Sequence, residues 1–117
     1  MSAPAKYLFI ASMDVEPDKL DVFNDVYDNE HVPMLKNVPG VVDIYRLSLE
    51  PLKLSMGGNI QEIVADGEPN FAAYYWIESP DVLTSEAWGD AIEEGRWPEQ
   101  VRPYTKTAAI PSGKLFK

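Results

Sequence analysis

Four strand-like segments impose the strongest constraint on how this chain can fold. Each is rich in β-branched and aromatic residues, the composition typical of strands. They are residues 6–13, 41–49, 71–79 and 104–110. The first is apolar nearly throughout, which predicts a strand buried on both faces. The turn at Val38-Pro39-Gly40 precedes the second.

A helical pattern fills the interval between the first two strands. Pro17 suits the first turn of a helix, and one apolar stripe follows at spacings of three and four. The stripe consists of Leu20, Phe23, Tyr27, His31 and Met34. Because Pro33 lacks an N–H group and disfavours helical geometry at the preceding residue, the helix should end or kink near His31.

A second helix is predicted between the last two strands. Ser79 and Pro80 suit its N-cap and first turn, and Gly95 suits its end after about Glu94. Residues 97–102 can form one further helical turn. The resulting order, β-α-β-β-α-β, predicts a ferredoxin-like α+β fold with a four-stranded antiparallel sheet, in a single domain over residues 1–117.

Residues 50–69 lie between the second and third strands and carry Gly57-Gly58 near their middle. A Gly-Gly pair suits a tight hairpin turn, whereas a loop of this length is also typical of a mobile flap. Six side chains make the segment too apolar for permanent exposure to water: Leu52, Leu54, Met56, Ile60, Ile63 and Val64. We therefore expect the segment to fold over a pocket mouth or onto a partner subunit.

Composition excludes several classes of function. The net charge of −9 disfavours nucleic acid and anionic membranes as partners. The absence of cysteine excludes disulfides, thiolate catalysis and cysteine-ligated metals. The apolar run near the start is too short for a signal peptide or a membrane span, so a cytoplasmic protein is expected. No metal site is indicated, because a single histidine stands among scattered carboxylates. A glycine-rich phosphate loop and a G-x-S-x-G nucleophile elbow are also missing from the sequence.

Several short motifs together resemble one known family. They are F-x-x-x-Y at 23–27, a histidine eight residues before Pro39-Gly40, Tyr-Arg at 45–46, and FAAYYWIESPDVLTSEAW at 71–88. This combination resembles the EthD-like branch of the dimeric α+β-barrel superfamily. The resemblance implies a homodimer whose two sheets form one barrel, with a pocket in each subunit between sheet and helices. Members include methylmuconolactone and muconolactone isomerases, polyketide cyclases and cofactor-free monooxygenases acting on aromatics. Several of them use a pocket histidine, but the pocket cysteine of the methylmuconolactone isomerases has no counterpart here.

His31 and Tyr27 are the candidate catalytic residues. Imidazole is the side chain best suited to proton transfer near neutral pH, and the stripe turns His31 toward the sheet. A structural histidine in the core is the alternative. A helix C-terminus favours the charged imidazole and an apolar pocket the neutral one, so the direction of any pKa shift stays open. Tyr27, one turn earlier, can orient the imidazole or a substrate oxygen, or simply belong to the core.

The candidate substrate-binding residues are Tyr7, Phe9, Phe23, Arg46, Tyr75 and Trp88. Resemblance to the polyketide cyclases implies that the odd-numbered faces of the first and third strands line the pocket. Leu8, Ile10, Tyr74 and Trp76 would then meet the partner subunit; strand alternation alone leaves the opposite assignment open. Arg46 either pairs with a carboxylate, which is the commoner arrangement for a buried charge, or holds a substrate carboxylate.

These residues favour a small cofactor-independent enzyme that isomerises, cyclises or cleaves a hydrophobic or aromatic-derived compound by proton transfer. A cofactor-free monooxygenase is the alternative among enzymes. A non-catalytic dimer that binds hydrophobic ligands is the alternative outside them.

Overall fold

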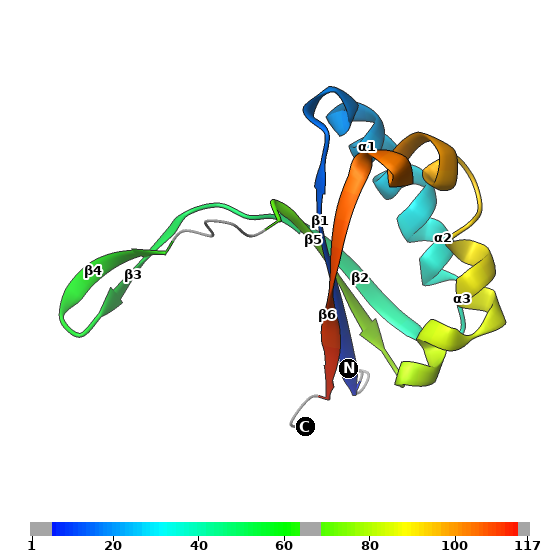
Figure 1. Cartoon of the computed structure of the whole chain (residues 1–117). Helices are drawn as coiled ribbons and strands as arrows, with labels where there is room; N and C mark the ends of the chain where they lie inside the picture. Colours follow the sequence, from blue (N-terminus) through cyan, green and yellow to red (C-terminus); the bar gives the residue numbers. More distant parts are fainter. Residues whose placement is uncertain (1–5, 64–68, 115–117) are drawn as a thin grey trace.

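A four-stranded antiparallel sheet forms the frame of the protein. The structure, a computed structural model, describes residues 6–63 and 69–114, with side chains up to Lys106. The strands β1 (Tyr7–Val15), β2 (Val41–Ser48), β5 (Phe71–Ile77) and β6 (Thr105–Lys114) lie in the order β2-β5-β1-β6. The helices all cover one face of this sheet (Figure 1). The predicted ferredoxin-like α+β fold is confirmed.

The sequence predicted that the first helical region ends or kinks near His31. The end is wrong: the region continues past His31, and a local widening of the helix lies at that place. A 3-10 turn (Pro17–Lys19) leads into α1 (Leu20–Val26), which continues through a π-helical turn (Tyr27–His31) into α2 (Val32–Lys36). In the π turn, the Val32 N–H donates to the Tyr27 carbonyl, five residues back. An α-helical Pro33 would leave the Asn29 carbonyl without a donor and its ring would clash there. The wider turn accommodates the proline, and the helix continues.

This π turn also changes which side chain is buried after His31. The predicted stripe continued to Met34, but Leu35 is fully buried and Met34 only half-buried. A π turn holds more residues than an α turn, so the inward-facing position moves one residue along the chain.

In place of the second predicted helix, the structure has two shorter helices. A 3-10 helix (Pro80–Thr84) is followed by α3 (Glu86–Ala91), and Ser85 between them is extended. The Ser85 hydroxyl accepts a hydrogen bond from the Trp88 N–H at 3.2 Å, so Ser85 is the N-cap of α3. Within the described ranges, no helix is long and apolar enough to span a membrane.

The extra helical turn predicted at 97–102 is present as a second π turn, Trp97–Val101, followed by a 3-10 turn, Arg102–Tyr104. Here the Arg102 N–H donates to the Trp97 carbonyl, and Pro103 comes next. The arrangement repeats that of Tyr27 to Pro33: an aromatic residue opens each π turn and a proline stands six positions later.

The core lies between the sheet and the helices. On β1 and β5 the odd-numbered side chains, such as Ala11, Met13 and Tyr75, face the helices. A register shift in β2 after Val41 places Ile44 on this same side. The opposite face of the sheet, hereafter the open face, carries Leu8, Ile10, Tyr45, Leu47, Tyr74 and Trp76. Nothing in the described chain covers that face, so β1 is mostly half-buried in a single copy, and burial on both faces is not reached within one copy.

Residues 50–63, hereafter the arm, form a hairpin that projects away from the sheet (Figure 1). Its strands are β3 (Leu52–Met56) and β4 (Asn59–Ile63), and both linking glycines have positive φ, 64° at Gly57 and 82° at Gly58. Positive φ at both central positions is the type I′ hairpin geometry, so the hairpin alternative was correct. The arm extends away from the helices, so it does not cover a pocket in its own chain. Val64 lies outside the described residues.

Candidate functional site

His31 closes the first π turn and lies among aromatic rings. It is 5% exposed. Its imidazole stacks on the Trp97 indole, with 4.1 Å between ring centroids and 13° between ring planes. The Tyr27 ring meets it edge-on at 5.1 Å. Its Nδ1 atom is buried and has no hydrogen-bond partner among the described residues.

Burial decides the charge of His31. Loss of water around the ring, reinforced by the nearby positive charge of Arg102, lowers the pKa of His31 from 6.5 to about 4. The sequence left the direction of this shift open, and desolvation outweighs any helix-end effect. The imidazole is therefore neutral at physiological pH, with one ring nitrogen free to accept a proton.

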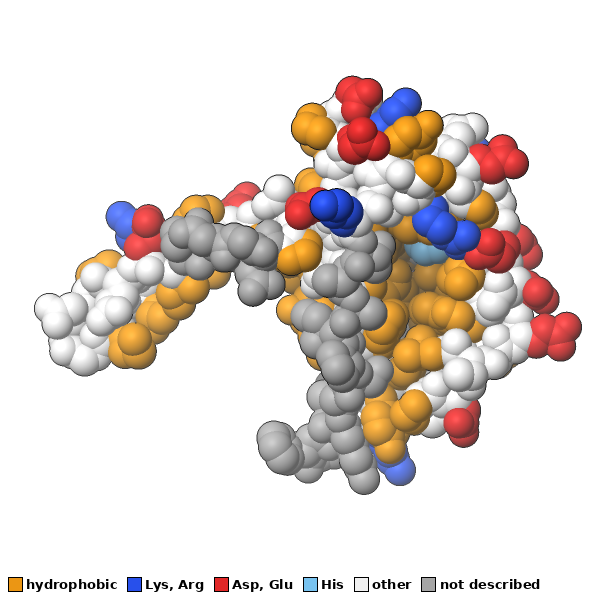
Figure 2. Space-filling view, viewed as in Figure 1, with side chains coloured by type: hydrophobic (Ala, Val, Ile, Leu, Met, Phe, Trp, Pro, Cys, Tyr) orange, Lys and Arg blue, Asp and Glu red, His pale blue; other side chains and the backbone are white. Residues whose placement is uncertain are grey.

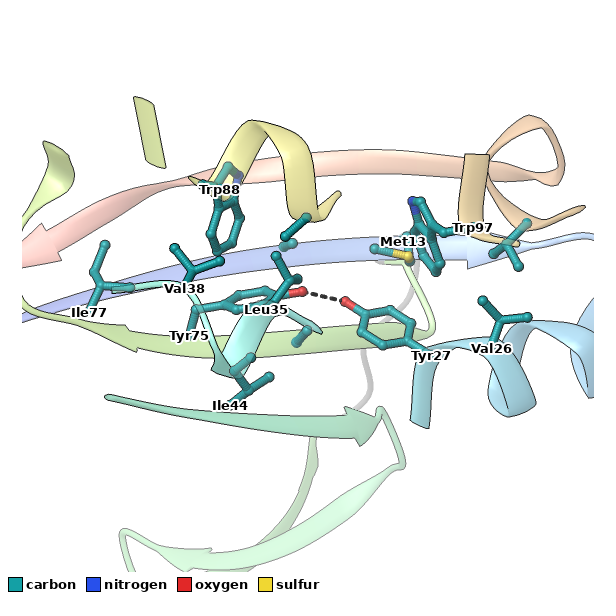
Figure 3. Packing of buried hydrophobic residues seen from close by; sticks show 14 of the residues in the cluster. Met13, Val26, Tyr27, Leu35, Val38, Ile44, Tyr75, Ile77, Trp88 and Trp97 are labelled. Carbon is teal, nitrogen blue, oxygen red and sulfur yellow. Dashed lines mark hydrogen bonds between the residues drawn. The ribbon is translucent and has the colours of Figure 1, made fainter. Parts of the chain in front are cut away.

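Tyr27 and Tyr75 form a hydrogen-bonded pair inside the core (Figure 3). Their hydroxyl oxygens are 2.7 Å apart, and each residue is 2% exposed. Burial raises the pKa of Tyr27 to about 12 and that of Tyr75 well above its ordinary value. Both are therefore neutral phenols. One hydroxyl donates to the other, and the accepting hydroxyl keeps its own proton for another acceptor.

Arg46 reaches from β2 onto the first helical region. Its guanidinium donates to Asp28 at 2.6 Å and to the Asn24 side-chain oxygen at 2.9 Å. It also lies 4.4 Å above the Tyr27 ring and 5.2 Å above the Phe23 ring. The structural pairing considered for this residue is thus present within the chain. These contacts hold the Arg46 guanidinium against the outer side of the Tyr27 ring.

The remaining candidates lie in three places. Phe9, Tyr75 and Trp88 form a cluster of rings, with centroids 5.5 to 6.3 Å apart. Phe23 is fully buried and belongs to the core. Tyr7 lies further along the helix side of β1 and is half-buried, and among the described residues it makes no ring contact with the others.

A hollow lined by hydrophobic side chains opens between the end of the sheet at β6 and the helices (Figure 2). The pale blue of the chain's only histidine is visible at its upper end. Three other hollows, of about 360, 260 and 380 Å³, lie elsewhere on the described surface, and His31 is not among their lining residues. We therefore place the candidate site at the hydrophobic hollow.

Trp97 is the site residue that sequence reasoning missed. Its indole forms one side of the His31 environment. The sequence signal is the repeated spacing noted above, which runs from Tyr27 to Pro33 and again from Trp97 to Pro103. Glu30 is turned away from the site, and its carboxylate accepts hydrogen bonds from the Arg96 backbone N–H at 3.0 Å and the Arg96 side chain at 2.5 Å.

Fold and side chains together define a class: a ferredoxin-like α+β unit with a buried neutral histidine beside an apolar hollow. The amino-acid sequence matches no protein-family model and no curated protein. Solved structures do match along nearly the whole chain.

An EthD family protein from Bacillus halodurans aligns with a TM-score of 0.57 and 11% identity, covering 91% of this chain and 97% of that one. A putative antibiotic biosynthesis monooxygenase from Nitrosomonas europaea aligns at 0.53 and 14%, covering 94% and 99%. The heme-degrader MhuD from Mycobacterium tuberculosis, with two hemes in its active site, aligns at 0.54 and 12%, covering 95% and 96%. The resemblance to EthD-like proteins is thus confirmed as a likeness of fold.

Proposed function

We propose that this protein is a small enzyme that transfers a proton on a hydrophobic or aromatic-derived small molecule, without needing a cofactor. His31 would be the proton acceptor, and the Tyr27–Tyr75 pair would supply a neutral O–H donor to a substrate oxygen. The observation that carries this proposal is the neutral imidazole, whose buried Nδ1 has no hydrogen-bond partner in the described part of the chain. Buried polar groups are nearly always paired, so an unpaired one beside a hollow calls for a ligand that completes it.

The depressed pKa of His31 defines the reaction it suits. The imidazole is in its basic form at any pH above about 5, but protonating it in an apolar site is costly unless negative charge develops nearby. Abstraction of a proton next to a carbonyl group creates such charge on the carbonyl oxygen. The enolate would then stabilise the imidazolium, and a phenol donor would stabilise the enolate. Isomerisation, cyclisation and elimination all begin with this step.

A cofactor-free monooxygenase is the second candidate. The name of the Nitrosomonas europaea neighbour favours it. A carbanion formed by the same proton abstraction would react with dioxygen, so the two candidates share the role of His31 and differ in oxygen consumption. A dimer that only binds hydrophobic compounds is the non-enzymatic candidate.

The proposal is tested by proton exchange, because the final product need not be known. The protein is incubated in D2O with a panel of hydrophobic lactones, β-keto esters and aryl ketones, and NMR follows deuterium entering the position next to the carbonyl. We expect exchange with at least one compound, and a loss of at least about a hundredfold in rate for His31→Gln. Glu99→Gln, an exposed change, is the matched control and should keep the wild-type rate.

The outcomes separate the candidates. Oxygen uptake with the exchanging compound favours the monooxygenase. Binding of the compounds without exchange or uptake favours the non-catalytic protein, and an undiminished rate in His31→Gln refutes the role of the histidine.

We also propose that the protein works as a homodimer joined through the open face. Large hydrophobic side chains such as Tyr45 and Leu47, 58% and 37% exposed, lie on this face without a cover. A contiguous exposed apolar area of this kind is typical of an interface.

A further inference from the structure

The arm has one apolar and one polar face. Residues paired directly across two strands share a face of a sheet. The pairs Leu52–Ile63, Leu54–Gln61 and Met56–Asn59 therefore form one face, and Lys53–Glu62 and Ser55–Ile60 form the other. The first face carries four of the five large apolar side chains of the arm, and the second carries both of its paired charges. This alternation is typical of strands with one face buried and one in water.

Every described residue of the arm is nevertheless exposed. Leu52, Met56 and Ile63 are 65%, 53% and 52% exposed. An isolated two-stranded hairpin is marginally stable at best in water, and it needs packing on one face to persist. The apolar face of the arm is therefore a surface that requires a partner.

The large hydrophobic side chains left exposed on the described part of the chain all fall between residues 42 and 63. Besides those of the arm, they are Val42, Tyr45, Leu47 and Leu49 on β2 and its extension. The arm leaves the sheet where Leu49 N–H bonds to the Asn70 carbonyl at 2.7 Å, and Asn70 N–H bonds to the Asp14 carboxylate at 2.7 Å. The exposed apolar surface of β2 thus continues into that of the arm. The two hydrogen bonds at the base of the arm hold it away from the helices of its own chain.

Charge is arranged to suit a second copy of the same chain. With a net charge of −9, two copies repel each other unless their acidic side chains stay apart. Most acidic side chains visible in Figure 2 lie over the helices, whereas hydrophobic side chains line the underside of the arm and the neighbouring side of the sheet. Those two surfaces border one concave space. A second copy related by a twofold axis presents the same two surfaces and fills both spaces at once.

We infer that the apolar face of the arm docks on a second copy of this chain. In the resulting dimer, the arm of each copy packs against the other copy. The inference rests on the proposed homodimer and adds the arm to its interface.

The first test asks whether the arm touches the other copy. Lys53 is the only lysine of the arm and lies on its polar face. Equal amounts of ¹⁴N and ¹⁵N protein are mixed, left to exchange and treated with a carbodiimide, which joins lysines to carboxylates. We expect Lys53 crosslinks between ¹⁴N and ¹⁵N peptides. Crosslinks within single copies only would overturn the inference.

The second test compares two neighbouring positions on opposite faces of the arm. Leu54→Glu places a charge on the apolar face, and Ser55→Glu places the same charge on the polar face as the matched control. Sedimentation should show at least a tenfold weaker dimer for Leu54→Glu and less than a twofold change for Ser55→Glu. A dimer unaffected by both substitutions refutes arm exchange but leaves the sheet-to-sheet dimer standing. A wild-type monomer refutes both, while the proton-exchange test of His31 remains independent.

Discussion

A neutral imidazole held between two aromatic rings makes the stability of this protein depend on pH in a definite window. In the unfolded chain the His31 imidazole has its ordinary pKa of 6.5, and in the folded chain the pKa is about 4. Below pH 6.5 the His31 imidazole therefore binds a proton in the unfolded state, whereas in the folded state it stays unprotonated until the pH approaches 4. The stability contributed by the neutral ring is fully present above pH 6.5 and is lost progressively as the pH falls toward 4.

We predict that the free energy of unfolding drops by about 2 kcal/mol between pH 7 and pH 5 because of His31. Urea unfolding at the two pH values, at one fixed protein concentration, measures the difference. The chain has no other histidine, and the carboxylates are the same in the wild type and in a His31 variant, so comparing the two isolates the imidazole. His31→Gln should remove most of the drop. An equal drop in both proteins would show that the imidazole is not shielded from water.

The Tyr27–Tyr75 pair gives a second residue-scale prediction. Tyr27→Phe or Tyr75→Phe leaves one buried hydroxyl without its partner, which should cost about 1–3 kcal/mol of stability. The double substitution removes both hydroxyls, so it should cost less than the sum of the two single changes. Urea unfolding of the four proteins measures this coupling. Additive costs would mean that the two hydroxyls do not depend on each other.

Single residues were predictable where periodicity decides their direction. The helical stripe correctly turned Tyr27 and His31 inward. Strand alternation grouped residues within each strand, and the resemblance placed the faces of Phe9 and Tyr75 on the same side, as the structure has them. The charge of His31 could not be predicted from the sequence, because it depends on how completely Trp97 and its neighbours exclude water. The partner of Arg46 was likewise unpredictable, since it depends on the distance between β2 and the first helical region.

At the scale of elements, α3 depends on a short N-terminal cap. Ser85→Ala removes the hydroxyl that accepts the Trp88 N–H, so it should lower the free energy of unfolding by about 1 kcal/mol. Ser79→Ala is the control. Its hydroxyl contacts the Asp81 N–H at a longer 3.3 Å and caps only a 3-10 turn, so a smaller loss is expected. No loss in Ser85→Ala would mean that α3 is held by packing of Trp88 alone.

The element boundaries show what sequence patterns capture. The four strands of the sheet were found from β-branched and aromatic runs, and the hairpin of the arm was one of two alternatives read from Gly57-Gly58. The π geometry of the two turns was not predicted. Before Pro33 the sequence indicated only an end or a kink, and at residues 97–102 only one further helical turn. The interruption at Ser85 was missed because Ser79-Pro80 offered an equally good start.

At the scale of the whole molecule, the open face sets the predicted assembly. Tyr45 is 58% exposed, so Tyr45→Glu should leave the fold of a single copy intact. A charge at the centre of a dimer interface should weaken dimerisation by at least about tenfold, because a buried unpaired charge is costly. Sedimentation velocity over a range of concentrations measures the effect. Gln100→Glu, an exposed change on the helical side, is the control and should leave the dimer unaltered.

The three tryptophans are divided between the two sides of the sheet, and this gives the molecule separate optical reporters. Trp76 is half-buried on the open face, whereas Trp88 and Trp97 are buried on the side of the candidate site. Covering Trp76 would shift its fluorescence toward the blue as two copies associate. Trp97 responds to a different event: a proton arriving on the imidazole stacked 4.1 Å away would place a full charge against its indole. Assembly and protonation can thus be followed by the protein's own light emission, without an added label.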